Sequence, residues 1–167
     1  MPLEVERKFL VTGDFSAAVS RSTRIVQGYL NSDPERSVRV RIKGDEGFLT
    51  VKGPGNASGT TRYEWEKKIS MPEAKELLAL CEPGKIDKIR HLVPFGSHIL
   101  EVDVFYGANT GLILAEAELA DEAEFFERPP WLGEEVTHDP RYFNASLSRR
   151  PFGEWREADP AQEALED

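Results

Sequence analysis

Charged or polar side chains alternate with apolar ones in seven short segments of this 167-residue chain, and this alternation limits the possible folds more than any other feature. Successive side chains of a β-strand point to opposite faces, so a period of two predicts strands. An eighth, shorter segment is also typical of a strand. The eight predicted strands comprise residues 4–9, 25–30, 38–43, 49–52, 63–69, 86–90, 100–104 and 114–119.

The connections between these segments favour an α+β fold. Residues 44–47 predict a tight hairpin and residues 109–111 another, so neighbouring strands are expected to be antiparallel. Apolar stripes and capping residues predict short helices over residues 14–20, 72–81, 121–127 and 139–149. Eight antiparallel strands with peripheral helices indicate a closed or nearly closed sheet, an eight-stranded antiparallel β-barrel.

The composition excludes several classes of protein. The net charge of −9 argues against a nucleic-acid partner or an anionic membrane surface. A single cysteine, Cys81, excludes an internal disulfide framework and a thiolate metal cluster. No apolar run approaches the roughly 20 residues that span a bilayer, and no signal peptide is visible at the start. We therefore expect a cytoplasmic protein, without a membrane partner, that is a monomer or homodimer.

The acidic charge is concentrated at the C-terminus. Residues 154–167 contain six acidic residues and one basic residue, and they lack a clear apolar period. Segments of this kind are commonly disordered. We expect one domain over residues 1–153, followed by an acidic, disordered tail over residues 154–167.

Charges of one sign are sorted by strand. Positive residues share a face of the segment 38–43, whereas negative residues share faces at 4–6, 101–103 and 116–118. These faces could point to solvent, as charged faces of sheets usually do. Like charges about 7 Å apart repel one another, however, unless a counter-charge lies opposite. If the charged faces point into the barrel instead, the interior would suit a polyanion bridged by Mg²⁺ or Mn²⁺.

Taken together, the charged motifs resemble those of the CYTH superfamily, also called the triphosphate tunnel metalloenzymes, over residues 1–153. The opening Glu4-Val5-Glu6-Arg7-Lys8 is similar to its N-terminal Glu-x-Glu-x-Lys signature. The remaining motifs follow in the order of the family: Arg39 and Arg41, Lys52, Glu64 and Glu66, Lys88 and Arg90, Asp103, and then Glu116 and Glu118. The resemblance implies an eight-stranded antiparallel tunnel with these charged side chains inside, and so favours the inward orientation.

The resemblance also implies roles for individual residues. It places the metal-binding carboxylates at Glu4, Glu6, Asp103, Glu116 and Glu118. It places the substrate-binding cations at Lys8, Arg39, Arg41, Lys52, Lys88 and Arg90. Glu64, Glu66 and Glu101 are expected to pair with basic residues, and Lys43 could lie inside or at the surface. Tyr29, which would orient the attacking water, and Lys88 are the expected catalytic residues.

The implied activity is hydrolysis of a phosphoanhydride bond in a small-molecule triphosphate, above all inorganic tripolyphosphate, with Mg or Mn as the divalent cation. The alternatives are a class IV adenylate cyclase, a thiamine-triphosphatase, or a polyphosphate-binding module without catalysis. Residues 139–149 are expected to cover one mouth of the tunnel.

Overall fold

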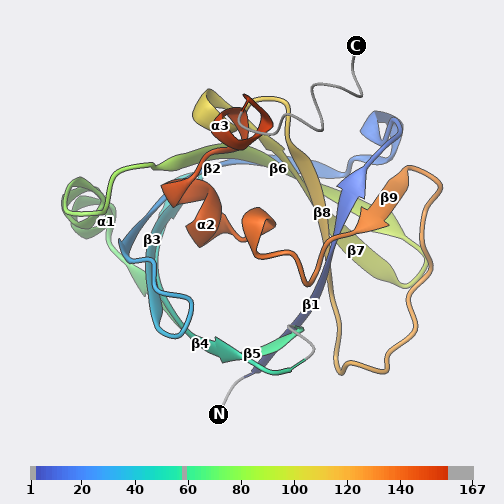
Figure 1. The fold of residues 1–167 in the computed structure, drawn as a ribbon, viewed down its shortest axis with the longest axis horizontal. Coiled ribbons are helices and arrows are strands. Elements are labelled where there is room, and N and C mark those ends of the chain that lie inside the picture. Colours follow the sequence, from blue (N-terminus) through green and yellow to red (C-terminus); the bar gives the residue numbers. More distant parts are fainter. Residues whose placement is uncertain (1–2, 58–59, 158–167) are drawn as a thin grey trace.

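The protein is described by a computed structural model that covers residues 3–57 and 60–157. Within this part of the chain, nine strands form one antiparallel sheet that curls into a barrel (Figure 1). The strands are β1 (Leu3–Val11), β2 (Arg21–Asn31), β3 (Ser37–Lys43), β4 (Glu46–Gly55), β5 (Thr61–Ile69), β6 (Ile86–Phe95), β7 (His98–Phe105), β8 (Ile113–Glu118) and β9 (Leu132–Glu135).

The first strand closes the barrel. The strand order is β5-β4-β3-β2-β6-β7-β8-β1-β9, and an additional pairing joins β5 to β1. The start of β1 pairs with β5, residues 6–10 pair with β8, and the end of the strand pairs with β9. The predicted eight-stranded antiparallel barrel is therefore confirmed. The ninth strand was not predicted, because its sequence Leu-Gly-Glu-Glu is short and has no alternation.

The helices agree only in part with the sequence-based predictions. The helix predicted over 72–81 is α1 (Met71–Ala79), which Ser70 and Glu73 begin with a capping box. The segment predicted over 14–20 is helical only in a single 3₁₀ turn, η1 (Ser16–Ala18), and a similar turn, η2 (Gly107–Asn109), precedes β8. None of the helices among the described residues is long and apolar enough to cross a membrane.

The helix predicted over 121–127 is absent, and this prediction was wrong. The Glu124 carboxylate accepts a hydrogen bond from the backbone N–H of Ala120, and its Oε2 lies 2.5 Å from Nε2 of His98. Phe126 is buried against Phe9. These tertiary contacts hold the segment as an irregular loop, because they outweigh its weak local helix preference.

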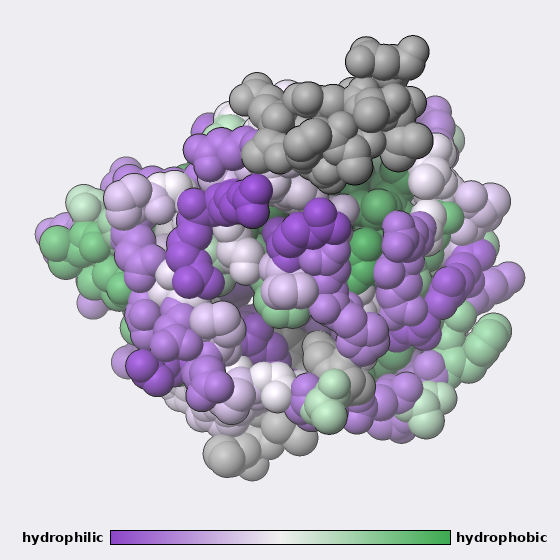
Figure 2. All heavy atoms as spheres, viewed as in Figure 1, coloured by the Kyte–Doolittle hydropathy of each residue, from purple (hydrophilic) through white to green (hydrophobic). Residues whose placement is uncertain are grey.

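The segment predicted as one helix over 139–149 is split. Asp139 caps a 3₁₀ turn, η3 (Pro140–Tyr142), and α2 (Asn144–Arg149) follows. Phe143 between them is extended, with φ of −69° and ψ of 138°, and so it interrupts the helix. We call η3, Phe143 and α2 the plug, because they lie within the ring of strands when the barrel is viewed along its axis (Figure 1). Hydrophilic residues predominate around the plug on this face of the molecule (Figure 2).

The apolar core closes one end of the barrel and covers its outside. Ile86, Phe105 and Leu114 pack with Tyr142 and Leu147 of the plug. Two further clusters lie against other parts of the wall, one around Phe9 and Val102 and one beneath α1. The interior beyond the plug is thus left to polar side chains.

The expected tail begins too early in the sequence-based prediction. A short helix, α3 (Phe152–Glu157), extends past residue 153, and Trp155 on it is buried with only 7% of its surface exposed. The Trp155 ring packs edge-on against Tyr142 at 5.3 Å between ring centroids. The folded domain therefore includes the first part of this segment, and residues 158–167 lie outside the described residues.

Candidate active site inside the barrel

The strand register brings the sequence-predicted charges to the inner face. Directly opposite residues in an antiparallel pair share a face. Glu6 lies opposite Glu118, Lys8 opposite Glu116, and Arg90 opposite Asp103. These charged residues border or lie beside a cavity of about 400 Å³, whose lining includes Glu6, Arg39, Arg41, Lys43, Lys52, Glu64, Glu66, Arg90, Glu101, Glu116, Glu118 and Asn144. The charged faces point into the barrel, as the family resemblance implied.

Two arginines on β3 bring positive charge to this cavity. Arg41 donates from Nε to Gln27 Oε1 at 2.9 Å, and Arg39 donates from Nη2 to Thr50 Oγ1 at 3.3 Å. Burial, together with the positive charges of Arg39 and Arg90, lowers the pKa of Arg41 to about 9. The buried Nε of Arg39 has no hydrogen-bond partner among the described residues. An anion in the cavity would relieve both the repulsion and the missing hydrogen bond.

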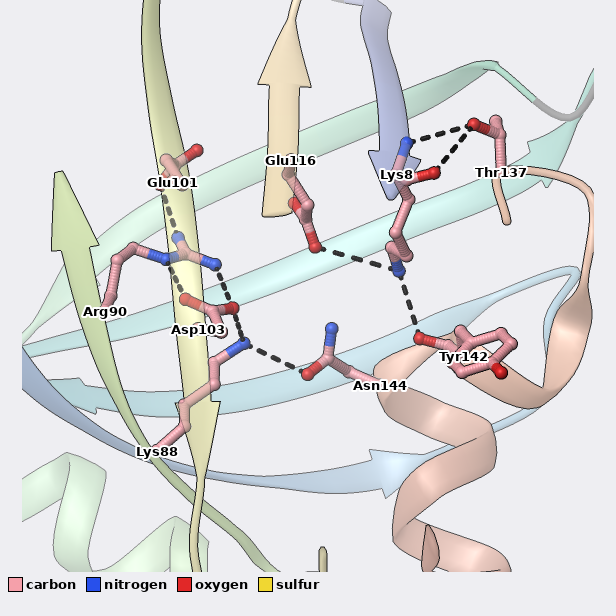
Figure 3. Close-up of polar contacts among 9 residues, drawn as sticks. All are labelled: Lys8, Lys88, Arg90, Glu101, Asp103, Glu116, Thr137, Tyr142 and Asn144. Carbon is pink, nitrogen blue, oxygen red and sulfur yellow. Dashed lines mark hydrogen bonds and ion pairs between the residues drawn. The ribbon is translucent and has the colours of Figure 1, made fainter. Parts of the chain in front are cut away.

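Arg90 and Lys88 on β6 share one carboxylate, that of Asp103 on β7 (Figure 3). Arg90 binds both oxygens of Asp103 at 2.8 and 2.9 Å, and Lys88 Nζ lies 2.7 Å from Oδ2. Burial alone would raise the pKa of Asp103, but the two cations outweigh burial and hold that pKa well below its usual range. Arg90 also contacts Glu101 at 2.6 Å. The expected pairing of Glu101 with a basic residue is therefore present.

This network alters the expected position of Asp103. The sequence-based prediction put Asp103 beside the metal-binding glutamates. In the structure the Asp103 residue is 1% exposed, and both carboxylate oxygens accept hydrogen bonds from Arg90 or Lys88. Asp103 thus lies among the cations, because its place on β7 is directly opposite Arg90.

Lys88 and Lys8 contact the plug. Lys88 is completely buried, and its Nζ donates to Oδ1 of Asn144 at 3.1 Å. Burial lowers the pKa of Lys88 to about 7, although Asp103 opposes this shift. Lys8 donates from Nζ to the backbone oxygen of Tyr142 at 3.1 Å and lies 3.7 Å from Glu116 (Figure 3). The plug therefore supplies neutral oxygen acceptors to two of the predicted substrate-binding lysines.

The carboxylates on β1 and β8 have the chemistry of a site for a hard divalent cation. Glu6 and Glu118 are direct cross-strand neighbours, and Glu116 is two residues away on the same face. Mg²⁺ is commonly held by one or two carboxylates together with phosphate oxygens and waters. The described residues contain no ready-made group of three or more carboxylate, His or Cys ligands. The side chain of Glu4 lies outside the described residues, although its backbone pairs with Arg62.

A second, smaller cavity of about 70 Å³ adjoins the first. Its lining includes Lys8 and Tyr29, which is buried on β2. It shares Glu6, Arg39, Lys52 and Asn144 with the larger cavity. Asn144 of the plug borders both cavities, so the site extends from the charged interior of the barrel to the plug.

Sequence reasoning missed three polar residues that line or support the site. Gln27 orients Arg41, and Thr50 links Arg39 to Glu66 through hydrogen bonds of 3.3 and 2.8 Å. Asn144 contacts Lys88 from the first turn of α2. Gln27 and Thr50 lie on the inner faces of predicted strands, so alternation could have identified them. No sequence pattern marks Asn144.

Comparison with known proteins agrees with this arrangement. Inorganic triphosphatase from Acetivibrio thermocellus is 44% identical over 158 residues, which cover 94% of this chain and 100% of the relative. Inorganic triphosphatase from Nitrosomonas europaea is 37% identical over 150 residues, with 87% and 96% covered. The crystal structure of the inorganic triphosphatase NE1496 superposes with a TM-score of 0.64 at 34% identity, covering 89% of this chain and 95% of that one. The CYTH domain family matches residues 2–152, and so the barrel, its inward charges and its closing plug belong to a member of the CYTH domain family.

Proposed function

We propose that this protein hydrolyses inorganic triphosphate with the help of Mg²⁺ or Mn²⁺. The observation that carries this proposal is one cavity with carboxylates on β1 and β8 and with Arg39, Arg41 and Arg90 on the other strands. Binding an anion alone requires no cluster of carboxylates. Both sets of charges are needed when a polyanion is bound together with a cation. Two relatives that carry the name inorganic triphosphatase support the same substrate.

The cations would hold the phosphate chain. Arg39, Arg41 and Arg90 present guanidinium groups, which bind phosphate oxygens two at a time, and Lys52 adds a point charge beside them. Lys8 lies nearer the plug, on the smaller cavity. These groups would also stabilise the negative charge that develops on the bridging and terminal oxygens as the phosphoanhydride bond breaks.

The carboxylates would hold the metal. Glu6 and Glu118 are opposed directly, and Glu116 and the predicted ligand Glu4 share their strands. A bound divalent cation would screen the phosphate oxygens and favour departure of pyrophosphate. Asp103 is assigned a different task here, since it neutralises and orients Arg90 and Lys88.

Water would attack the terminal phosphorus in line with the leaving oxygen. Tyr29 faces the smaller cavity, and its hydroxyl, which both donates and accepts hydrogen bonds, can orient this water. Lys88 lies behind Asn144 and would act through its positive charge at the deep end of the site. A polyanion in the cavity raises the pKa of Lys88 and thereby keeps it protonated.

The proposal is tested by incubating the purified protein with tripolyphosphate, ATP or thiamine triphosphate and resolving the products. We expect phosphate and pyrophosphate from tripolyphosphate with Mg²⁺ or Mn²⁺, no turnover in EDTA, and weaker recovery with Ca²⁺, which prefers looser coordination. If cyclic AMP is the main product from ATP, the protein is a cyclase and the proposed hydrolase activity is wrong. If the protein binds tripolyphosphate tightly but does not hydrolyse it, the protein is a binding module without catalysis.

A further inference from the structure

Asn144 occupies a place in the site that its sequence context does not suggest. It is the first residue of α2, and its side chain borders both cavities. Lys88, in contrast, is completely buried and borders neither cavity. The amide of Asn144 therefore stands between the ammonium group of Lys88 and the space that a phosphate chain would fill.

The contact with Lys88 determines which way this amide points. A lysine ammonium can only donate hydrogen bonds, so the group that faces it at 3.1 Å must be the amide oxygen. Lys88 is in turn held by Asp103 at 2.7 Å, so the ammonium has little freedom to move. The NH₂ group of Asn144 must then face the opposite way. Figure 3 shows it pointing away from Lys88, toward the side where Glu116 and Lys8 meet.

We propose that Asn144 is a substrate-binding residue that donates hydrogen bonds from Nδ2 to the phosphate chain, with Lys88 and Asp103 fixing the orientation of its amide. This inference rests on the proposed function, because it concerns the same substrate. The positive charge of Lys88 polarises the amide and strengthens its donors. Because the NH₂ group of Asn144 is neutral, it can bind phosphate oxygens where the cavities adjoin without adding to the repulsion among the arginines.

The decisive variant is Asn144→Asp, which keeps the shape of the side chain. It replaces the two N–H donors with a carboxylate, which repels phosphate but forms an ion pair with Lys88. We expect KM for tripolyphosphate to rise at least about 10-fold, as for the loss of a hydrogen bond to a charged group. The melting temperature of the protein without substrate should stay the same or rise. A residue with a purely structural role would not show this opposite change in substrate binding and stability.

A second variant and a control complete the experiment. Asn144→Ala should also raise KM, and this increase should largely vanish in a Lys88→Met background, in which the amide is no longer oriented. Arg149→Ala is the matched control, since Arg149 lies on the same helix but is exposed. It should keep the wild-type KM.

The outcomes separate this inference from the proposed function. If the wild-type protein hydrolyses no triphosphate, the proposed function fails and the inference fails with it. If the wild type is active but Asn144→Asp keeps a wild-type KM, only the inference is overturned. It is also overturned if Arg149→Ala raises KM equally, or if Asn144→Asp folds but is less stable than wild type and binds substrate less tightly. Should Asn144→Asp fail to fold, the kinetics of Asn144→Ala in the two backgrounds decide.

Discussion

Replacing Asp103 with Asn tests whether this residue is an ion-pair partner or a metal ligand. The substitution keeps the size of the side chain but removes its charge. Arg90 would retain Glu101 at 2.6 Å, whereas Lys88 would lose the carboxylate that contacts it and keep the neutral oxygen of Asn144. The NH₂ group of the new asparagine would also replace one oxygen that now accepts hydrogen bonds, and it would face a donor of Arg90 or Lys88. The variant therefore leaves a buried positive charge without its main partner.

The cost can be estimated from these contacts. Removing one partner of a buried ion pair typically costs about 3–5 kcal/mol. For a domain of this size, each kcal/mol lowers the melting temperature by about 2–4 °C, which gives a decrease of roughly 6–20 °C. In the folded variant Lys88 can lose its proton, whereas in the unfolded chain it stays charged up to its ordinary pKa near 10.4. The unfolded state therefore binds more protons, so the stability of the variant should recover as the pH rises. The loss should be larger at pH 6 than at pH 9.

Thermal and urea unfolding in EDTA measure this loss without any bound metal. Glu118→Gln is the matched control, because it also neutralises one carboxylate that borders the cavity but at an exposed position. It should change the free energy of unfolding by less than about 1 kcal/mol. If Asp103→Asn in EDTA is as stable as wild type, or more stable, then Asp103 belongs with the mutually repelling carboxylates and the ion-pair assignment is wrong.

Three further predictions follow from the charges. Glu6→Gln should lower kcat strongly, and Arg41→Ala should raise KM because it removes a two-pronged phosphate contact. If steady-state kinetics give wild-type values for both variants, the assignment of these residues to the active site is wrong. Tripolyphosphate should show a higher kcat/KM than ATP, and pyrophosphate should be nearly inert, since unmatched buried cations are costly; equal use of ATP would refute this. The hydrogen bonds from Arg7 lower the pKa of Glu135 to about 2. Glu135→Gln should therefore lower the free energy of unfolding by about 1–2 kcal/mol at pH 7, after allowance for partial exposure. Unfolding curves should show this difference disappearing as the pH falls from about 4.5 toward 2.

Alternation in the sequence was sufficient to predict the strands, but not the direction of their faces. The pattern around Arg39 and Arg41 is the same whether the arginines point to solvent or into a barrel. The direction depends on closure between β1 and β5, a contact between distant parts of the chain. Repulsion between like charges left the direction open, and the order of the charged motifs, compared with a known family, favoured the inward orientation.

The parts that could not be predicted depend on tertiary contacts. The burial of Lys88 behind Asn144 requires the plug to enter the barrel, and Phe143 makes the break that allows it. Asp103 was expected beside the metal-binding glutamates because of its charge and motif. Its actual partners are determined by the strand register, which places it opposite Arg90. Phe126 likewise draws its loop into the core, despite neighbours that favour a helix.

The three partners of β1 have a consequence for how the chain folds. The first strand contacts β8 and β9, and the pair Arg7 and Glu135 is separated by 128 positions in sequence. Such distant contacts slow folding to the range of milliseconds to seconds. During synthesis the strand that carries Glu4, Glu6 and Lys8 would wait, paired at most over three residues with β5, until β8 and β9 leave the ribosome. Assembly of the acidic side of the site is therefore expected to be among the last events of folding.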